Sequence, residues 1–206
     1  MLCQRLGLSL PTLKRLGGWS PINEDTLEAW YQNGYDMVQA TASEQPAYSA
    51  GVLTFVPTDT NNLQTTGQVS LTDDFTIGIK LTPSAFNNVV LADNTTVHEF
   101  FKITNSSQLR IRMDSSGNQA NLDLDSGTFG DDYLVITRVS DVLTLWQNGV
   151  AQTGTTPTLS GTADIDAIGV RRTDLNAYAG TIKEIQIYST STAALTANVN
   201  DRLSTL

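Results

Sequence analysis

The chain has 206 residues, 21 of them acidic and 12 basic, so its formal net charge is -9 and its pI is about 4.4. Charged residues make up only 16% of the sequence. Because an acidic surface repels phosphate backbones, we expect no nucleic-acid partner. We also expect no membrane partner, since no apolar run reaches the ~20 residues that cross a bilayer.

Cysteine usage and the first residues indicate where the chain folds. Cys3 is the only cysteine, so this sequence cannot form an internal disulfide. The opening stretch "MLCQRLGLSLPTLKRLGG" does not resemble a secretory signal, because basic residues and a proline interrupt its apolar character. We therefore expect synthesis and folding in a cytoplasm.

Residues 1–25 differ from the rest of the chain and are expected to form a docking arm with one short helix. Pro11 suits a first helical turn, leucines recur at helical spacing, and Gly17 can end the helix. So short a helix cannot bury its apolar stripe alone, so it either clasps its own subunit or docks on a neighbouring protein. The expected docking residues are Leu6, Leu8, Leu10, Leu13, Lys14, Arg15, Leu16 and Trp19.

From residue 26 to residue 189 the sequence is typical of β-strands. Runs rich in β-branched and aromatic residues alternate apolar with polar positions and are bounded by Gly, Pro, Asn and Asp. The expected strands are residues 26–33, 51–57, 75–82, 97–104, 108–115, 118–125, 132–139, 142–148, 149–155, 166–173 and 179–189.

Tight turns and the absence of intervening helices predict how these strands pair. Asn148-Gly149 in "LWQNGVAQT" and Ser140-Asp141 each predict a hairpin, and a third turn is expected at residues 115–118. We therefore predict an all-β domain at residues 26–206, in which antiparallel strands form either two packed sheets, a β-sandwich, or a barrel. The side chains expected on its inner face include Ile77, Ile79, Leu81, Leu134 and Ile136.

A C-terminal helix is expected to close the domain. Leu195, Val199, Leu203 and Leu206 fall on one helical stripe, and Thr196 is a candidate N-cap.

Three segments in order resemble the closing third of the laminin-G-like, concanavalin A-like lectin/glucanase domains. They are "DYLVITRVSDVLTLWQNGVAQTGT", "IDAIGVRR" and "YAGTIKEIQIYSTSTAALT". The earlier "LEAWYQN" and "GVLTFVPTDTNNL" are similar to the opening strands of that family, so the resemblance spans about residues 27–206. It implies a jelly-roll sandwich. Short, uncharged strands behind an unrelated arm also look like virion proteins of tailed bacteriophages.

The sequence lacks the signature of the glycosidases that share this fold. Those relatives carry Glu-x-Asp-x-x-Glu on one strand, so that two carboxylates face one cleft. Here only Glu24 and Glu28 lie close together, and the aspartate between them is at the wrong offset. His98 is the only histidine and has no nucleophile motif beside it. We therefore expect no enzymatic activity.

Other acidic positions have ordinary structural explanations. Asp123 with Asp125, and Asp164 with Asp166, place alternate carboxylates on one strand face, as solvated strands and turns commonly do. We assign no cofactor.

A structural calcium ion is the metal that the resemblance raises, because many laminin-G-like domains hold one at a sandwich edge. Oxygen ligands occur in "LADNTT" (Asp93, Asn94) and "RRTDLNAY" (Asp174, Asn176), but such loops are also ordinary turn chemistry. We assign no metal site.

Aromatic residues near polar loops are candidates for stacking on a sugar ring. These are Trp146, Tyr178 and Tyr133, although the position of Trp146 in a periodic run also fits packing. The adjacent Arg171 and Arg172 point to opposite faces of a strand and are assigned no site.

These observations lead to two hypotheses. The first is a non-enzymatic virion structural protein, in the head decoration, tail or fibre, that anchors by its arm to other virion proteins and occurs as a homo-oligomer or in multiple copies. It would be located in the virion and made in the host cytoplasm. The alternative is a carbohydrate-binding, lectin-like module that attaches to glycans on the host surface.

Overall fold

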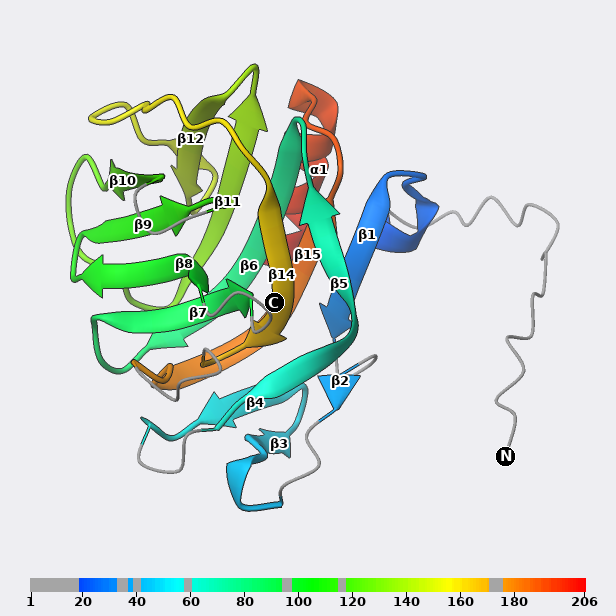
Figure 1. Ribbon diagram of the computed structural model, residues 1–206, viewed down its shortest axis with the longest axis vertical. Helices are drawn as coiled ribbons and strands as arrows, with labels where there is room; N and C mark the ends of the chain where they lie inside the picture. Colours follow the sequence, from blue (N-terminus) through cyan, green and yellow to red (C-terminus); the bar gives the residue numbers. More distant parts are fainter. Residues whose placement is uncertain are drawn as a thin grey trace, which may run out of the picture.

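The computed structural model describes residues 19–32, 37–38, 42–57, 61–93, 98–114, 118–170 and 176–206. Two antiparallel sheets pack face to face, and one α-helix lies on the outer face of one of them (Figure 1). The prediction of an all-β, two-sheet sandwich with a C-terminal helix is confirmed. Two short 3-10 helices, η1 (Pro21–Asn23) and η2 (Ala42–Glu44), lie before β1 and β3.

We call the two layers sheet A and sheet B. Sheet A has the order β13-β12-β11-β6-β15-β4-β3, and β1 also pairs with β15. Its strands are β1 (Leu27–Gln32), β3 (Ala47–Ser49), β4 (Val52–Phe55), β6 (Phe75–Pro83), β11 (Asp132–Val139), β12 (Val142–Gln147), β13 (Val150–Ala151) and β15 (Gly180–Tyr188). Sheet B has the order β10-β9-β8-β7-β14-β5-β2. Its strands are β2 (Met37–Val38), β5 (Leu63–Leu71), β7 (Asn88–Asp93), β8 (His98–Asn105), β9 (Gln108–Arg112), β10 (Gln119–Asp123) and β14 (Ala163–Ile168).

The core lies between the sheets and follows the predicted alternation. Ile77, Ile79 and Leu81 of β6 lie beside Leu134 and Ile136 of β11, and all five are buried in one cluster. Burying such side chains contributes about 1.5–3 kcal/mol each. Period-two patterning therefore identified the inner face of sheet A correctly.

Two of the predicted tight turns are present. Ser140 and Asp141 have φ values of 49° and 66°, and Asn148 and Gly149 have φ values of 51° and 81°. Two successive positive φ values define the turn that matches the twist of a two-residue hairpin. The third turn lies largely outside the described residues, although the strands that it joins, β9 and β10, do pair.

The sequence reading missed two long strands and misjudged the ends of others. β5 was missed because "LQTTGQVSL" has few apolar residues, and β7 because it is buried on both faces and does not alternate. The expected strand at 149–155 shrinks to two residues, and the one expected at 166–173 begins earlier and ends at Ile168. Gly169 follows with a φ of 91°, which ends the extended run.

The C-terminal helix, α1 (Ala193–Ser204), packs on the outer face of sheet A. Its N-cap is Thr192, whose Oγ1 accepts a hydrogen bond of 3.1 Å from Leu195 N. The prediction of Thr196 as the cap was wrong, because that residue lies inside the helix and is buried. We use the name outer cluster for Val135, Tyr188, Leu195, Val199 and Leu203, which pack together between α1 and the sheet. None of the helices among the described residues has the length and apolar character of a membrane crossing.

Gly78 of β6 lets α1 approach the sheet closely. A Cβ at this position would lie 2.4 Å from Val199 Cγ1 and 3.1 Å from Leu203 Cδ1. Real atoms do not approach so closely, so any larger residue here would push the helix away.

We therefore expect Gly78→Ala to lower the free energy of unfolding by about 1–3 kcal/mol, the usual cost of overpacking. Urea denaturation measures the change. Gly67→Ala is the matched control, because no atom lies within 4 Å of the added Cβ, and it should change stability by less than about 0.5 kcal/mol. Equal effects from the two variants would contradict the role given to Gly78.

Arg138 of β11 is a buried cation held by backbone carbonyls. It is 1% exposed, donates to Asp73 O at 2.8 Å and to Gly161 O at 2.6 Å, and its guanidinium lies 5.0 Å from the Phe75 ring centroid. Burial lowers the pKa of the Arg138 guanidinium, and nearby carboxylates oppose that shift. The side chain thus joins two loops at one end of the sandwich.

Replacing Arg138 with methionine should lower the free energy of unfolding by at least about 2 kcal/mol, because each buried carbonyl left without a donor costs about 1–3 kcal/mol. Arg138→Lys keeps the charge but has one nitrogen, so we expect an intermediate loss. Thermal and urea denaturation of the three proteins give this ranking, and a methionine variant as stable as the parent would refute it.

Candidate functional site

Trp19 is the one predicted docking residue within the described part of the chain. Its ring lies 6.3 Å from that of Tyr188 at an angle of 45°, its Nε1 donates to Glu24 Oε1, and the side chain packs against the outer cluster. Trp19 therefore contacts its own subunit. The other predicted docking residues lie outside the described residues: Leu6, Leu8, Leu10, Leu13, Lys14, Arg15 and Leu16.

A groove of about 580 Å³ lies between α1 and the outer face of β11 and β12. We call it the α1–β12 groove. It combines aromatic rings with hydroxyl and amide groups, and its residues come from two strands, one turn, the segment just before α1 and α1 itself. The residues that line it are Tyr133, Thr137, Val139, Thr144, Trp146, Gly149, Ser191, Thr192, Ala193, Thr196, Ala197, Asn200 and Asp201.

Strand alternation brings these side chains to the outer face. Leu134 and Ile136 point into the core, so Tyr133 and Thr137 of β11 point outward. Their partners on β12 follow the same rule, and Thr137 lies opposite Thr144. Because α1 packs against β6 and β11, the neighbouring strand β12 keeps an open outer face, and the groove forms in that corner.

Two buried polar atoms of groove residues have no hydrogen-bond partner. They are Trp146 Nε1, a donor, and Asn200 Oδ1, an acceptor. Asn200 is 8% exposed, and its Nδ2 donates to Thr196 O at 2.9 Å. That bond fixes the amide, since only the NH2 group can donate to a carbonyl, and it leaves Oδ1 as a buried acceptor without a partner. Leaving a buried polar group without a partner costs about 1–3 kcal/mol, so a ligand hydroxyl that reached these atoms would be favoured.

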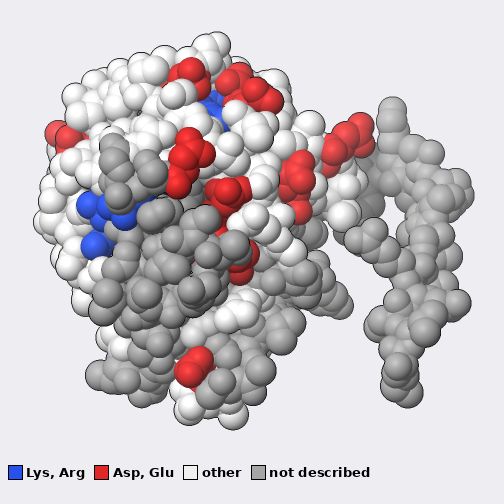
Figure 2. Space-filling model, in the orientation of Figure 1, with Lys and Arg blue, Asp and Glu red and all other residues white. Residues whose placement is uncertain are grey.

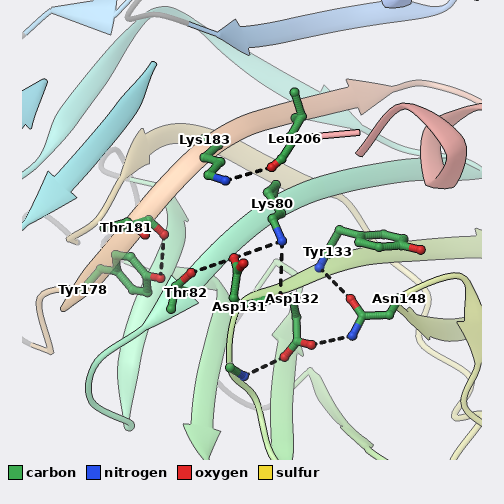
Figure 3. Close-up of polar contacts among 11 residues, drawn as sticks. Lys80, Thr82, Asp131, Asp132, Tyr133, Asn148, Tyr178, Thr181, Lys183 and Leu206 are labelled. Atoms are coloured by element: carbon green, nitrogen blue, oxygen red, sulfur yellow. Dashed lines mark hydrogen bonds and ion pairs between the residues drawn. The ribbon is translucent and has the colours of Figure 1, made fainter. Parts of the chain in front are cut away.

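Asn148, in the hairpin between β12 and β13, holds the β11 end of the groove (Figure 3). Its Oδ1 accepts from Tyr133 N at 3.0 Å and its Nδ2 donates to Asp132 Oδ1 at 2.6 Å. Asp132 Oδ2 in turn accepts from Gly130 N at 2.6 Å. The Asn148 side chain therefore holds the backbone of Tyr133 in place. Because Asn148 and Gly149 form one turn, it also holds Gly149 in the groove wall.

A buried ion pair sets the position of the helix wall. Glu184 is fully buried, and its Oε2 lies 2.8 Å from Arg202 Nη2. Gln186 Nε2 donates to Glu184 Oε1 at 2.6 Å, and Tyr188 Oη donates to Gln186 Oε1 at 2.7 Å. The hydrogen bond to Glu184 raises the pKa of Arg202, and burial raises the pKa of the Tyr188 phenol. The helix is thus tied to β15 by charge as well as by packing.

Two lysines support the same face near the end of α1 (Figure 3). Lys183 Nζ donates to Leu206 O at 2.8 Å, beyond the last turn of α1. Lys80 Nζ lies 2.9 Å from Asp131 Oδ1, and Thr82 Oγ1 donates to the same oxygen at 3.0 Å. The hydrogen bonds from Lys80 and Thr82 lower the pKa of Asp131 below its ordinary value of 3.8.

Because folding lowers the pKa of Asp131, the stability that the carboxylate contributes is fully present above pH 3.8 and is lost as the pH falls through the lower folded-state pKa. We expect Asp131→Asn to be less stable than the parent at pH 6, with the difference shrinking as the pH falls below about 4. Urea denaturation from pH 2 to pH 7 measures it. Lys80→Met should give the same pattern, and a difference independent of pH would contradict the assignment.

The remaining candidates of the sequence reading are placed as follows. Tyr178 is fully buried against Phe55, with ring centroids 5.6 Å apart, so it is not a sugar platform and that suggestion was wrong. Asp125 accepts from Thr153 N and Gly154 N, which fastens the loop after β13. Those backbone hydrogen bonds lower the pKa of Asp125.

The other acidic candidates make structural contacts. Glu28 Oε1 accepts from Ser189 Oγ at 2.5 Å, and Ser70 Oγ donates to Asp164. Asp123 Oδ1 accepts from Gln108 at 2.7 Å and Asp93 Oδ1 from Gln68 at 3.1 Å. These carboxylates fasten strands and loops.

The calcium loops are only partly described, since Asn94, Asp174 and both adjacent arginines lie outside the described residues, and so does the side chain of His98. Asn176 has a φ of 58°, and its carbonyl accepts from Val89 N at 2.8 Å, as turn chemistry predicts. Within the described residues no group of three or more His, Cys, Asp or Glu side chains is placed to hold a metal ion.

The outer face of sheet B carries a different kind of surface. Lysine and arginine side chains gather over β8 and β9 in Figure 2, whereas acidic side chains are spread over the rest of that view. Lys102 of β8 lies opposite Arg110 of β9, and Arg112 Nη2 donates to Gln119 Oε1 at 2.9 Å. All three basic residues are engaged with neighbours. This basic group lies on the sheet opposite to the α1–β12 groove.

Of the aromatic candidates from the sequence, Trp146 and Tyr133 line the groove and also pack against the outer cluster, as the periodic run around Trp146 suggested. Thr196, Asn200 and the two strand threonines were missed, because nothing in their local sequence marks them as polar groups that face an aromatic ring. One signal was available. Thr196 and Asn200 each follow a leucine or valine of the helical stripe, so they lie at the edge of the buried face.

Comparisons with known proteins bear on the fold. A scan against protein-family models gives no match, and a search of curated proteins gives no significant match. Domain 4 of AbnA, a GH43 extracellular arabinanase from Geobacillus stearothermophilus solved with arabinotriose, is 15% identical, with 89% of this chain and 94% of that chain covered and a TM-score of 0.54. The CBM40 of the Ruminococcus gnavus IT-sialidase, bound to α2,3-sialyllactose, is 15% identical over 62% of this chain and 82% of that chain, with a TM-score of 0.44. The likeness to the arabinanase domain shows that this chain shares the fold of that domain, a two-sheet β-sandwich.

Proposed function

We propose that the chain is a lectin-like module that binds carbohydrate in the α1–β12 groove. The observation that carries the proposal is a groove in which Trp146 and Asn200 each present a buried polar atom without a partner. The fold likeness to a module solved with arabinotriose supports the same class of function. Of the two hypotheses from the sequence, these observations favour the carbohydrate-binding one.

The chemistry of the groove suits a sugar. Trp146 and Tyr133 are half-buried against the outer cluster, and the parts of their rings that line the groove can take the C–H face of a sugar, while the indole Nε1 can donate a hydrogen bond. The hydroxyls of Thr137, Thr144 and Thr196 surround them and can both donate and accept. Apolar walls with a few fixed polar groups are the usual construction of a ligand site.

The proposed module binds its ligand without cleaving it. Glycoside hydrolysis of the common kind needs two carboxyl groups about 5–9.5 Å apart across the scissile bond. Asp201 is the one carboxylate among the described residues that line the groove. We therefore propose a binding role and no hydrolysis.

A location on a phage particle, with the arm anchored to other virion proteins, stays a prediction. Seven of its eight docking residues lie outside the described part of the chain, so the support given above concerns glycan binding and not assembly. The two roles are compatible, since a lectin-like module for host-surface attachment displayed in many copies would gain avidity from each additional contact.

We expect a glycan array probed with the full chain to identify at least one bound saccharide, and Trp146→Phe to weaken that binding by about tenfold, which equals about 1.4 kcal/mol. Phenylalanine keeps much of the packing but removes Nε1. Isothermal titration calorimetry gives the dissociation constants. Tyr48→Ala is the control, because Tyr48 is an exposed aromatic on β3, outside the groove, and should leave binding unchanged. The proposal fails if no saccharide binds, or if the two variants bind alike.

A further inference from the structure

Among the described residues that line the α1–β12 groove, none carries a positive charge that could recognise a charged sugar. Asp201 is the only ionisable group of a Lys, Arg, His, Asp or Glu side chain among the described residues that line it. A sugar carboxylate, sulfate or phosphate in this groove would therefore meet a negative charge and no opposite charge.

The basic side chains around the described sandwich are committed elsewhere. Arg138 is buried between the sheets, Arg202 is paired with Glu184, and Lys183 holds the carbonyl of Leu206. Lys80 pairs with Asp131. The remaining group, over β8 and β9, lies on the other sheet (Figure 2).

The cost of placing an anion in the groove is then uncompensated. An ionised group that leaves water needs a paired charge or several donors to offset its lost hydration. The described residues that line the groove offer only uncharged donors, namely hydroxyl groups and Trp146 Nε1, and the buried acceptor Asn200 Oδ1 is one that an anionic oxygen cannot use. The formal net charge of -9 adds a long-range repulsion.

A neutral hydroxyl fits the same two atoms. A hydroxyl group has one donor proton and two acceptor lone pairs, so it can donate to Asn200 Oδ1 or accept from Trp146 Nε1. A saccharide carries several hydroxyl groups, so one ligand can supply partners of both kinds. A site that hydrogen-bonds hydroxyls in this way rejects analogues that lack them, because its own buried groups are then left without partners.

Building on the proposed function, we infer that the ligand of the α1–β12 groove is an uncharged saccharide, and that Asn200 and Trp146 select it through its hydroxyl groups. Asn200 Oδ1 accepts from one sugar hydroxyl and Trp146 Nε1 donates to a sugar oxygen. Asp201, at the edge of the groove, acts against acidic sugars.

The test compares sugars that differ only at C6. Oligosaccharides of galactose, glucose and mannose are titrated into the full chain by calorimetry, alongside the matching oligo-uronic acids, in which a carboxylate replaces the CH2OH group. For any sugar that binds, we expect the dissociation constant of the neutral oligosaccharide to be at least about tenfold lower than that of the matching oligo-uronic acid. Raising the salt concentration should leave the affinity of the neutral sugar unchanged, since no ion pair forms.

Three variants assign the effect to named groups. Asn200→Leu keeps the approximate side-chain volume but removes the acceptor, and should weaken neutral-sugar binding by about tenfold. Asp201→Asn should raise the affinity for the uronic acid by about threefold, because one repulsive charge is removed. Tyr48→Ala is the control, and a thermal melt of each variant confirms that it is folded.

The outcomes separate this inference from the proposed function. A uronic acid that binds more tightly than its neutral counterpart, and loses affinity in Trp146→Phe, would overturn the inference and leave the carbohydrate site in place. Equal affinities within each pair, or Asn200→Leu binding as the parent does, would overturn it too. Absence of binding to every saccharide would overturn the proposed function itself.

Discussion

The close contact between α1 and sheet A is the constraint on which the rest of the outer face depends. Gly78 has no side chain, so Val199 and Leu203 rest directly on the backbone of β6. The helix is thereby placed over β6 and β11 but not over β12. The α1–β12 groove is the space that remains beside α1, which Gly78 allows to pack closely against β6.

The buried ion pair adds direction to that packing. Apolar contacts alone would let a helix slide along or rotate on the sheet, whereas the ion pair joins Arg202 of the helix to Glu184 of β15 at 2.8 Å. Buried ion pairs often contribute little net stability, and their best-supported role is to fix a register. In this fold, that register places Asn200 and Thr196 in the lining of the same groove as Trp146.

The sequence predicted much of the sandwich, because the inner face of each alternating strand must be apolar. It failed where that rule weakens. β7 is buried on both faces, and β5 has a polar, glycine-containing sequence whose pairing is decided by its neighbours. The helix cap was wrongly placed at Thr196, because the sequence does not show where the chain leaves the extended conformation. That residue is Thr192, with φ -133° and ψ 155°. Of the groove residues, the sequence named the two aromatic ones, Tyr133 and Trp146, whereas those of the helix wall were missed because the position of α1 follows from tertiary packing.

Asn148 shows how one residue can serve the turn and the groove at once. Its φ of 51° is the reason that a hairpin favours asparagine here, and glycine would meet that requirement equally well. Glycine would not supply the amide that binds Tyr133 N and Asp132 Oδ1. Those two bonds tie the turn to the start of β11, where Tyr133 contributes its aromatic ring to the groove. The Asn-Gly sequence that identifies a hairpin therefore also fixes one wall of the proposed sugar site, which makes the turn part of the site's architecture and not only a connection between strands.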